Sequence, residues 1–61
     1  MNIGDLVRLK SGGPVMVVYL ILGEYVYAEW FDILNRECRA SFVPETLLKV
    51  DANNVAISDR P

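Results

Sequence analysis

The sequence contains no histidine and a single cysteine, Cys38. One cysteine cannot form an internal disulfide, so nothing indicates an oxidising compartment. Without histidine or a second cysteine, the usual zinc sites cannot be built, and Cys38 lacks the base that normally activates a nucleophilic thiol. We therefore expect a buried structural cysteine, with no metal site and no cofactor.

The sequence also lacks a basic surplus, since six Lys and Arg face eight Asp and Glu, for a net charge of −2. Nucleic-acid binders usually carry excess positive charge, because counterion release supplies much of their affinity. A local basic strip is the alternative. In it, Arg8, Lys10 and Arg39 would contact an anion or a nucleic acid beside aromatic side chains. The preferred interpretation is a solvated face with cross-strand ion pairs, because Glu29 and Glu37 lie on the same strands.

Long hydrophobic runs are absent as well. The longest, Val15–Leu22, is far shorter than the roughly 20 residues that span a bilayer. The N-terminus has no cationic region followed by an apolar stretch, so no signal peptide is indicated. We expect a cytoplasmic protein without membrane contact.

Paired carboxylates at a diagnostic spacing are also missing. The only acid–base candidates are Asp5, Glu29, Asp32 and Glu45, and their positions indicate no catalytic pair. A domain this small offers little room for a substrate pocket of roughly 300 Å³. We expect that the protein is not an enzyme.

Apolar residues are abundant, making up 52% of the 61 residues. A chain of this length buries only about 60% of the surface that its unfolded form exposes. Some of the apolar material must therefore lie on the surface, which favours an oligomer or a partner site.

The chain alternates between short β-rich runs and turn residues, a pattern typical of a small sandwich or barrel. The expected strands are Ile3–Lys10, Val15–Leu22, Tyr25–Phe31, Arg36–Val43 and Leu47–Val50, with one helical turn at Pro44–Thr46. The sequence predicts an all-β, five-stranded SH3-like barrel over residues 1–50. A flexible, polar C-terminal tail is expected over residues 51–61.

The segment Ser11–Pro14 separates the first two expected strands. Its glycines permit positive φ and its proline cannot donate to a ladder, so a tight turn is the preferred interpretation. Backbone N–H groups that bind an anion after Lys10 are the alternative, although the segment lacks the length and the following helix of a phosphate-binding loop.

The register of the second hairpin decides which side chains face outward. A three-residue loop, Gly23–Tyr25, would pair Leu20 with Ala28 and Val18 with Trp30. A two-residue loop would place Glu29 on the face of Val18, and burying an unpaired carboxylate is costly. The three-residue loop is therefore expected.

With that register, one face carries an outward apolar and aromatic set: Val17, Tyr19, Ile21, Tyr27 and Phe31. Such a set exceeds what a monomer normally exposes and has the composition of an interface core. We expect a protein interface there, extended by Ile33 and Leu34, while Trp30 faces the core. The competing interpretation is that curvature of the barrel, or the tail, covers part of this set.

The segment Gly4–Pro14 reads GDLVRLKSGGP. It is followed by Met16, Val18, Trp30, Phe31, Asp32, Phe42, Pro44, Glu45 and Leu47. Together these residues resemble the YodC-like family of small bacterial and phage proteins, over about residues 3–50. The members have no assigned activity, and Ala28 stands where they often have cysteine, which argues against a thiol function. The opening Gly-Asp-x-Val pattern is also similar to the first strand of KOW-type and other SH3-like modules, a likeness of fold alone.

The preferred function is a non-enzymatic binding module that acts through protein–protein interaction or self-association at the outward face. One alternative is a nucleic-acid-binding small barrel. A second, which rests on the phage members of the resembled family, is a phage-encoded inhibitor of a host defence system or a small-molecule sponge. The sequence alone identifies neither the partner nor the oligomeric state.

Overall fold

The computed structural model describes residues 1–51 and residue 53. Within them the chain forms five strands and one short 3-10 helix. The elements are β1 (Leu6–Leu9), β2 (Gly12–Leu22), β3 (Tyr25–Phe31), β4 (Glu37–Phe42), η1 (Pro44–Thr46) and β5 (Leu47–Lys49). The predicted all-β class, the number of strands and the helical turn before the last strand are confirmed.

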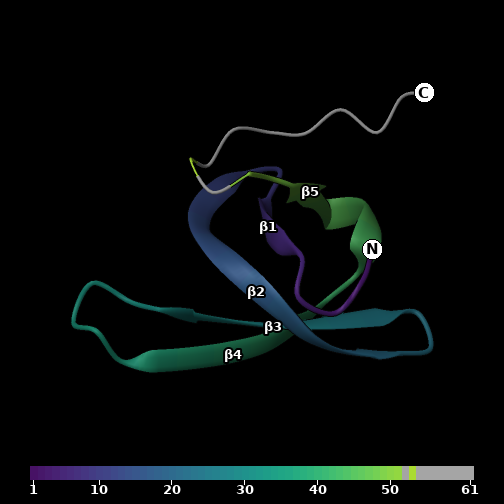
Figure 1. The fold of residues 1–61 in the computed structure, drawn as a ribbon, viewed down its shortest axis with the longest axis horizontal. Helices are drawn as coiled ribbons and strands as arrows, with labels where there is room; N and C mark the ends of the chain where they lie inside the picture. Colours follow the sequence, from purple (N-terminus) through teal and green to yellow (C-terminus); the bar gives the residue numbers. More distant parts are fainter. Residues whose placement is uncertain (52, 54–61) are drawn as a thin grey trace.

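All five strands lie in one sheet with the order β4-β3-β2-β1-β5, and every neighbouring pair is antiparallel. The long strand β2 curves from the β1 and β5 side of the molecule to the β3 and β4 side (Figure 1). β4 and β5 stay at opposite edges and do not pair within the described residues, so the sheet is open. The predicted closure into a barrel is not seen.

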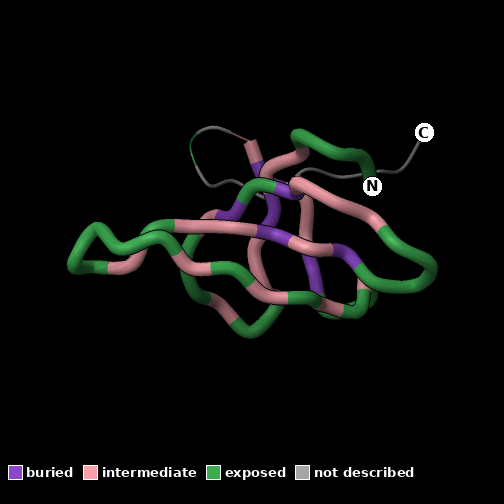
Figure 2. The backbone as a smooth tube through the Cα atoms, turned by 90° about the horizontal axis from the view of Figure 1, so that it is seen from below, coloured by how far each residue is buried: buried purple, intermediate pink, exposed green. Residues whose placement is uncertain are grey.

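The core lies on the concave side of this curved sheet. Its buried members come from β1, β2, β3 and β5: Val7, Met16, Val18, Val26, Ala28 and Leu47. Trp30 and Phe42 are partly buried and pack against this cluster, with ring centroids 6.3 Å apart. The inward orientation predicted for Trp30 is therefore confirmed, although the ring is only half-buried. Figure 2 shows the buried stretches near the centre of the sheet and the exposed stretches at its two lateral hairpin ends.

The first two strands differ from the prediction at the β1 end of the sheet. β1 begins at Leu6, three residues later than predicted, and Ile3 is 64% exposed. A turn precedes the strand, because the Asp5 carboxylate accepts the Asn2 N–H at 2.8 Å and Gly4 has a φ of 95°. β2 in turn begins at Gly12, since Leu9 already pairs with Gly12 across a turn of two residues. The predicted break over Ser11–Pro14 is therefore wrong for its last three residues.

The predicted register of the β2–β3 hairpin is also wrong. Leu22 pairs with Tyr25 across a two-residue turn, Gly23–Glu24, whose positive φ at Gly23 matches a type II′ turn. The register then shifts between Val18 and Leu20, so that Val18 pairs with Ala28. One extra residue in β2 is the mark of a β-bulge. The bulge keeps Val18 away from Glu29 and so resolves the conflict that had excluded the shorter loop.

β3 has the predicted bounds, and η1 covers Pro44–Thr46 as predicted. Proline suits the first position of a helical turn because its missing N–H would be unpaired there. The Thr46 hydroxyl donates to the Val43 carbonyl at 2.7 Å, which fixes the turn. The predicted tail lies outside the described residues except for Asp51 and Asn53. No helix in the described part of the chain is long and apolar enough to cross a membrane.

Candidate functional site

The outer face of β2, β3 and β4 carries four of the five residues predicted for an interface. Val17 and Phe31 are 39% and 63% exposed, whereas Tyr19 and Tyr27 are half-buried. The fifth, Ile21, pairs with Val26 and packs against the core, so its predicted outward position is wrong. The bulge is the cause, because it reverses the facing of the β2 residues that follow it.

The two tyrosines form one cluster with a cation on this face. Their rings meet edge to face, with centroids 6.3 Å apart. The guanidinium of Arg39 on β4 lies 5.4 Å from the centre of the Tyr19 ring, within the range of a cation–π contact. Each tyrosine ring therefore already has a contact inside the molecule, so the pair offers less free area than the predicted face implied.

Arg39 is also bound to two carboxylates. Its Nε lies 3.3 Å from Glu29 Oε2, and its Nη2 lies 3.1 Å from Glu37 Oε1. The Arg39–Glu29 pair joins β4 to β3 and is a cross-strand ion pair of the kind expected, whereas the Arg39–Glu37 pair lies within β4. A phosphate that approached Arg39 would compete with both carboxylates.

The other two predicted cations lie on a different part of the sheet. Arg8 is on β1, and Lys10 follows it in the turn, where its N–H donates to the Thr46 carbonyl at 2.8 Å. In the sheet order, β2 and β3 separate β1 from β4, the strand of Arg39. Arg8, Lys10 and Arg39 are therefore not neighbours along one continuous strip of adjacent strands.

Three of the four most exposed large apolar side chains of the described residues gather at the end of the β3–β4 hairpin. Phe31 is 63% exposed, Ile33 is 99% exposed and Leu34 is 67% exposed. We call these three residues the apolar tip. The hairpin extends away from β1 and β5, so the tip projects at one side of the molecule (Figures 1 and 2). A large aliphatic side chain that contacts almost nothing in its own chain contributes little to the fold and is available to a partner.

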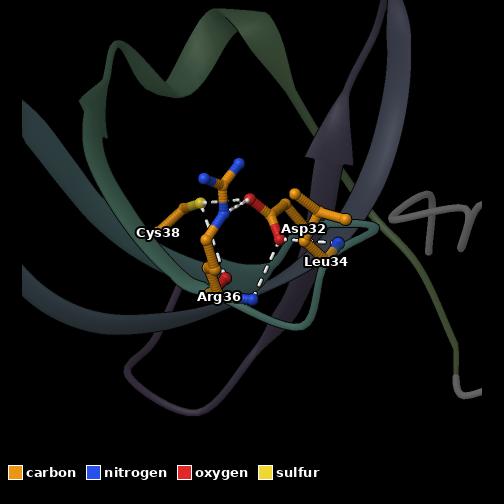
Figure 3. A network of polar contacts seen from close by, with 4 residues as sticks. All are labelled: Asp32, Leu34, Arg36 and Cys38. Atoms are coloured by element: carbon orange, nitrogen blue, oxygen red, sulfur yellow. Dashed lines mark hydrogen bonds and ion pairs between the residues drawn. The ribbon is translucent and has the colours of Figure 1, made fainter.

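The carboxylate of Asp32 organises the backbone of this tip. Its Oδ1 accepts the N–H groups of Leu34 and Arg36, both at 2.9 Å, and its Oδ2 accepts Arg36 Nε at 2.8 Å (Figure 3). Backbone bonds close the loop, from Asn35 N–H to the Asp32 carbonyl at 2.8 Å and from Asp32 N–H to the Arg36 carbonyl at 3.0 Å. Asn35 supplies the one left-handed residue of the loop, with a φ of 60°. The tip is therefore a hydrogen-bonded turn with a defined shape.

These bonds also set the charge state of the carboxyl. The N–H of Arg36 is the main cause that lowers the pKa of Asp32 below its ordinary value of 3.8. Desolvation acts in the opposite direction, while the Arg36 guanidinium and the Leu34 N–H lower the pKa further. Asp32 is therefore ionised at neutral pH and holds the loop as a charged acceptor.

Cys38 lies at the base of the same turn. Its Sγ is 3.6 Å from the Arg36 carbonyl and 4.0 Å from Asp32 Oδ2, distances that suit a weak thiol donor (Figure 3). The residue is half-buried, less than expected, and its contacts are those of a structural thiol. Within residues 1–51 and 53, no group of three Cys, Asp or Glu side chains is placed to hold a metal ion.

Sequence reasoning centred the interface on the sheet and treated the tip as its extension. The sequence did contain the signal, because Ile33 and Leu34 stand between Asp32 and Asn35, two residues that favour turns. Large aliphatics inside such a turn cannot reach the core. That argument does not depend on the pairing register of β2 and β3, and it places the exposed apolar surface at the end of the β3–β4 hairpin.

Comparison with known proteins identifies a family. The model of a family described as an uncharacterized small protein family (DUF2158) matches residues 2–47. This range includes all five strands except the last two residues of β5. No curated protein and no solved structure matches the chain.

Proposed function

The chain belongs to this family of uncharacterized small proteins, and we propose from its surface that it is a non-enzymatic binding module for a protein partner. The apolar tip of Phe31, Ile33 and Leu34 makes the contact, and Val17 and the tyrosine pair lie on the same face of the sheet. The partner is a foreign protein or a second copy of the chain.

The exposure of Ile33, at 99%, is the observation that carries this proposal. Transfer of a Leu or Ile side chain from water into a protein contact is worth about 1.5–3 kcal/mol. When no partner is bound, Ile33, Leu34 and Phe31 remain in water and this energy is not gained. Central apolar anchors surrounded by polar residues are typical of the positions that dominate interfaces.

The hydrogen bonds of Asp32 support the proposal independently. A loop that is already ordered loses less conformational freedom on binding than a flexible one, which improves affinity. Here two backbone N–H groups and one guanidinium hold the turn through a single carboxylate. An ionised side chain therefore fixes the conformation of a loop whose apolar side chains make few contacts within the chain.

The finer SH3-like assignment belongs to the same proposal. Five antiparallel strands, a strongly curved β2 and a 3-10 turn before the last strand support it. The YodC-like resemblance rests on residues that fall inside the matched range, and it suggests no activity. Neither assignment supplies the partner.

The nucleic-acid alternative has weaker support. Arg39 is already paired with Glu29 and Glu37, and two strands separate it from β1, the strand of Arg8. No feature of the described residues favours a role against host defence over another protein partner.

The test compares the tip with an exposed aliphatic residue elsewhere. Ile33→Asp places a charge in the tip, and Ile3→Asp makes the same change at a side chain that is 64% exposed and far along the chain. Size-exclusion chromatography with light scattering reports self-association, and affinity capture from the source cell reports foreign partners. We expect Ile33→Asp to abolish the dimer or the captured protein while Ile3→Asp retains it. Equal behaviour of the two variants, or a wild-type monomer that captures nothing, would refute the proposal.

A further inference from the structure

A hollow of about 290 Å³ lies at the end of the sheet opposite the apolar tip. It is lined by Glu24, Tyr25, Val43, Pro44 and Glu45. Two of these residues come from the β2–β3 turn and the start of β3, and the others from the segment after β4. In Figure 1 the β2–β3 turn lies at the right and the β3–β4 loop at the left. The hollow is therefore a surface separate from the tip.

The hollow is distinguished by its two carboxylates. Asp5 lies 3.9 Å from Lys49 Nζ, Asp32 pairs with Arg36, and Arg39 pairs with both Glu29 and Glu37. Asp51 accepts the N–H of Asn53. Among the carboxylates of the described residues, only Glu24 and Glu45 have neither an ion pair nor a hydrogen bond within that part of the chain.

The rest of the lining is apolar or aromatic. Tyr25 is 51% exposed and Val43 is 41% exposed, and Pro44 completes the lining. A side chain that combines a hydrocarbon stem with a cationic head matches this combination. The stem would contact Val43 and Pro44, and the head would meet the Tyr25 ring and the carboxylates.

Both walls of the hollow are fixed by local structure. Glu24 occupies the second position of a two-residue turn in which Gly23 has a φ of 56°. Glu45 lies in η1, whose backbone is closed by the Thr46 N–H and hydroxyl, both donating to the Val43 carbonyl. The backbone positions of Glu24 and Glu45 are therefore set by the fold, and no loop must become ordered when a ligand binds.

We propose that this hollow binds an arginine side chain in a basic peptide segment of a partner protein. Arginine fits better than lysine, because its planar guanidinium stacks on an aromatic ring and donates to two carboxylates at once. The net charge of −2 on the chain adds long-range attraction for a basic segment. The site is exposed, so the contact is weak alone and adds to binding elsewhere on the same partner.

The test uses two capped tripeptides, acetyl-Ala-Arg-Ala-amide and the same peptide with citrulline, the neutral isostere of arginine. Each is titrated into the full chain, and the amide resonances are followed by nuclear magnetic resonance. We expect the arginine peptide to shift the amides of residues 23–25 and 43–46, and the citrulline peptide to shift them little. Absence of these shifts at about 10 mM arginine peptide, or equal shifts with citrulline, overturns the proposal.

Three single charge variants and one double variant locate the contact. Glu24→Gln and Glu45→Gln should each raise the Kd roughly twofold to fivefold, and the double variant roughly tenfold. Glu37→Gln makes the same change of net charge at a carboxylate already paired with Arg39, and it should leave the Kd unchanged. An equal loss in all three single variants shows that net charge alone is responsible and overturns the proposal.

The result of the peptide titration can be distinguished from the result of the test of the apolar tip. Ile33→Asp alters the tip and leaves the hollow intact, so it should bind the arginine peptide as the wild type does. Loss of peptide binding in that variant places the contact at the tip and refutes the inference. Failure of the tip to bind a protein has no bearing on this titration.

Discussion

The ring of Tyr19 lies edge to face against the ring of Tyr27, with centroids 6.3 Å apart, although the ladder pairs Tyr27 with Leu20. Tyr19 is the extra residue of the β2 bulge and has no partner of its own on β3. The bulge therefore places two neighbouring β2 side chains near one residue of β3 and brings Tyr19 within reach of Arg39 as well.

Truncation of the bulge residue should weaken the fold. Tyr19→Ala removes the contacts with Tyr27 and Arg39, and we expect a loss of about 1–2 kcal/mol in the free energy of unfolding, measured in urea. Tyr19→Phe keeps the ring and should stay within about 0.5 kcal/mol of the wild type. A Phe variant as unstable as the Ala variant would show that the hydroxyl is the stabilising group.

Apolar residues of the core and of the tip should differ sharply in their effect on stability. Met16 is 2% exposed, so Met16→Ala should cost about 2–5 kcal/mol. A chain of this length has roughly 3–9 kcal/mol of stability, so much of the variant should be unfolded, as judged by circular dichroism. Leu34→Ala, at a side chain that is 67% exposed, should cost less than about 0.5 kcal/mol. Similar losses in the two variants would mean that the tip is packed in solution.

The left-handed residue of the β3–β4 loop should tolerate glycine and reject a β-branched residue. Asn35 has a φ of 60°, a conformation that costs an ordinary L-residue about 1–2 kcal/mol. Asn35→Val should therefore lower the Tm, whereas Asn35→Gly should leave it nearly unchanged. A Tm for the Val variant equal to that of the wild type would contradict the loop conformation.

The charge on Asp32 should make part of the stability depend on pH. Because the folded state lowers the pKa of Asp32, the unfolded chain binds more protons in acid, and the stabilisation is present above the ordinary value of 3.8. It is lost as the pH falls below 3.8 and through the lower folded value. Asp32→Asn keeps an oxygen acceptor for the N–H groups and removes the charge. The difference in unfolding free energy between wild type and Asp32→Asn should therefore be constant near neutral pH and shrink below about pH 4. A difference that stays constant down to pH 2 would show that the charge has no such role.

Most of the secondary structure could be predicted from the sequence, because it depends on neighbouring residues. β3 and η1 follow from β-branched and aromatic enrichment and from Pro44 at a first helical position. The facing of Met16, Val18, Val26 and Ala28 also follows, since burial requires them on one side.

The bulge at Tyr19 could not be predicted in the same way. Its segment contains no glycine and continues the β pattern, so nothing local marks the extra residue. Both registers compared above assume a regular ladder. A regular ladder allows either the favourable two-residue turn or a core free of Glu29, but not both. The bulge allows both, which is why Ile21 faces inward while Leu20 shares the side of Tyr27. Closure of the sheet is equally beyond local pattern, because it depends on the summed curvature of all strands.

At the candidate site, Phe31 was predicted from alternation along β3, and its exposure of 63% agrees. The hydrogen bonds of Asp32 were not predicted, because an acidic residue in a turn is common and its partners depend on the loop conformation. The hollow between the β2–β3 turn and η1 was not predicted either. Its two walls are about twenty residues apart in the sequence and meet only once the sheet has formed.

The bonds that shape the β3–β4 loop run to backbone N–H groups and to the Arg36 side chain, and none involves the side chains at positions 33 and 34. The side chains at positions 33 and 34 can therefore be substituted while the loop keeps its conformation and the core keeps its packing. Two substitutions at these positions can therefore change the exposed apolar surface of the hairpin at almost no cost to folding. The hairpin end thus separates the residues that determine the loop conformation from the residues that form its exposed surface.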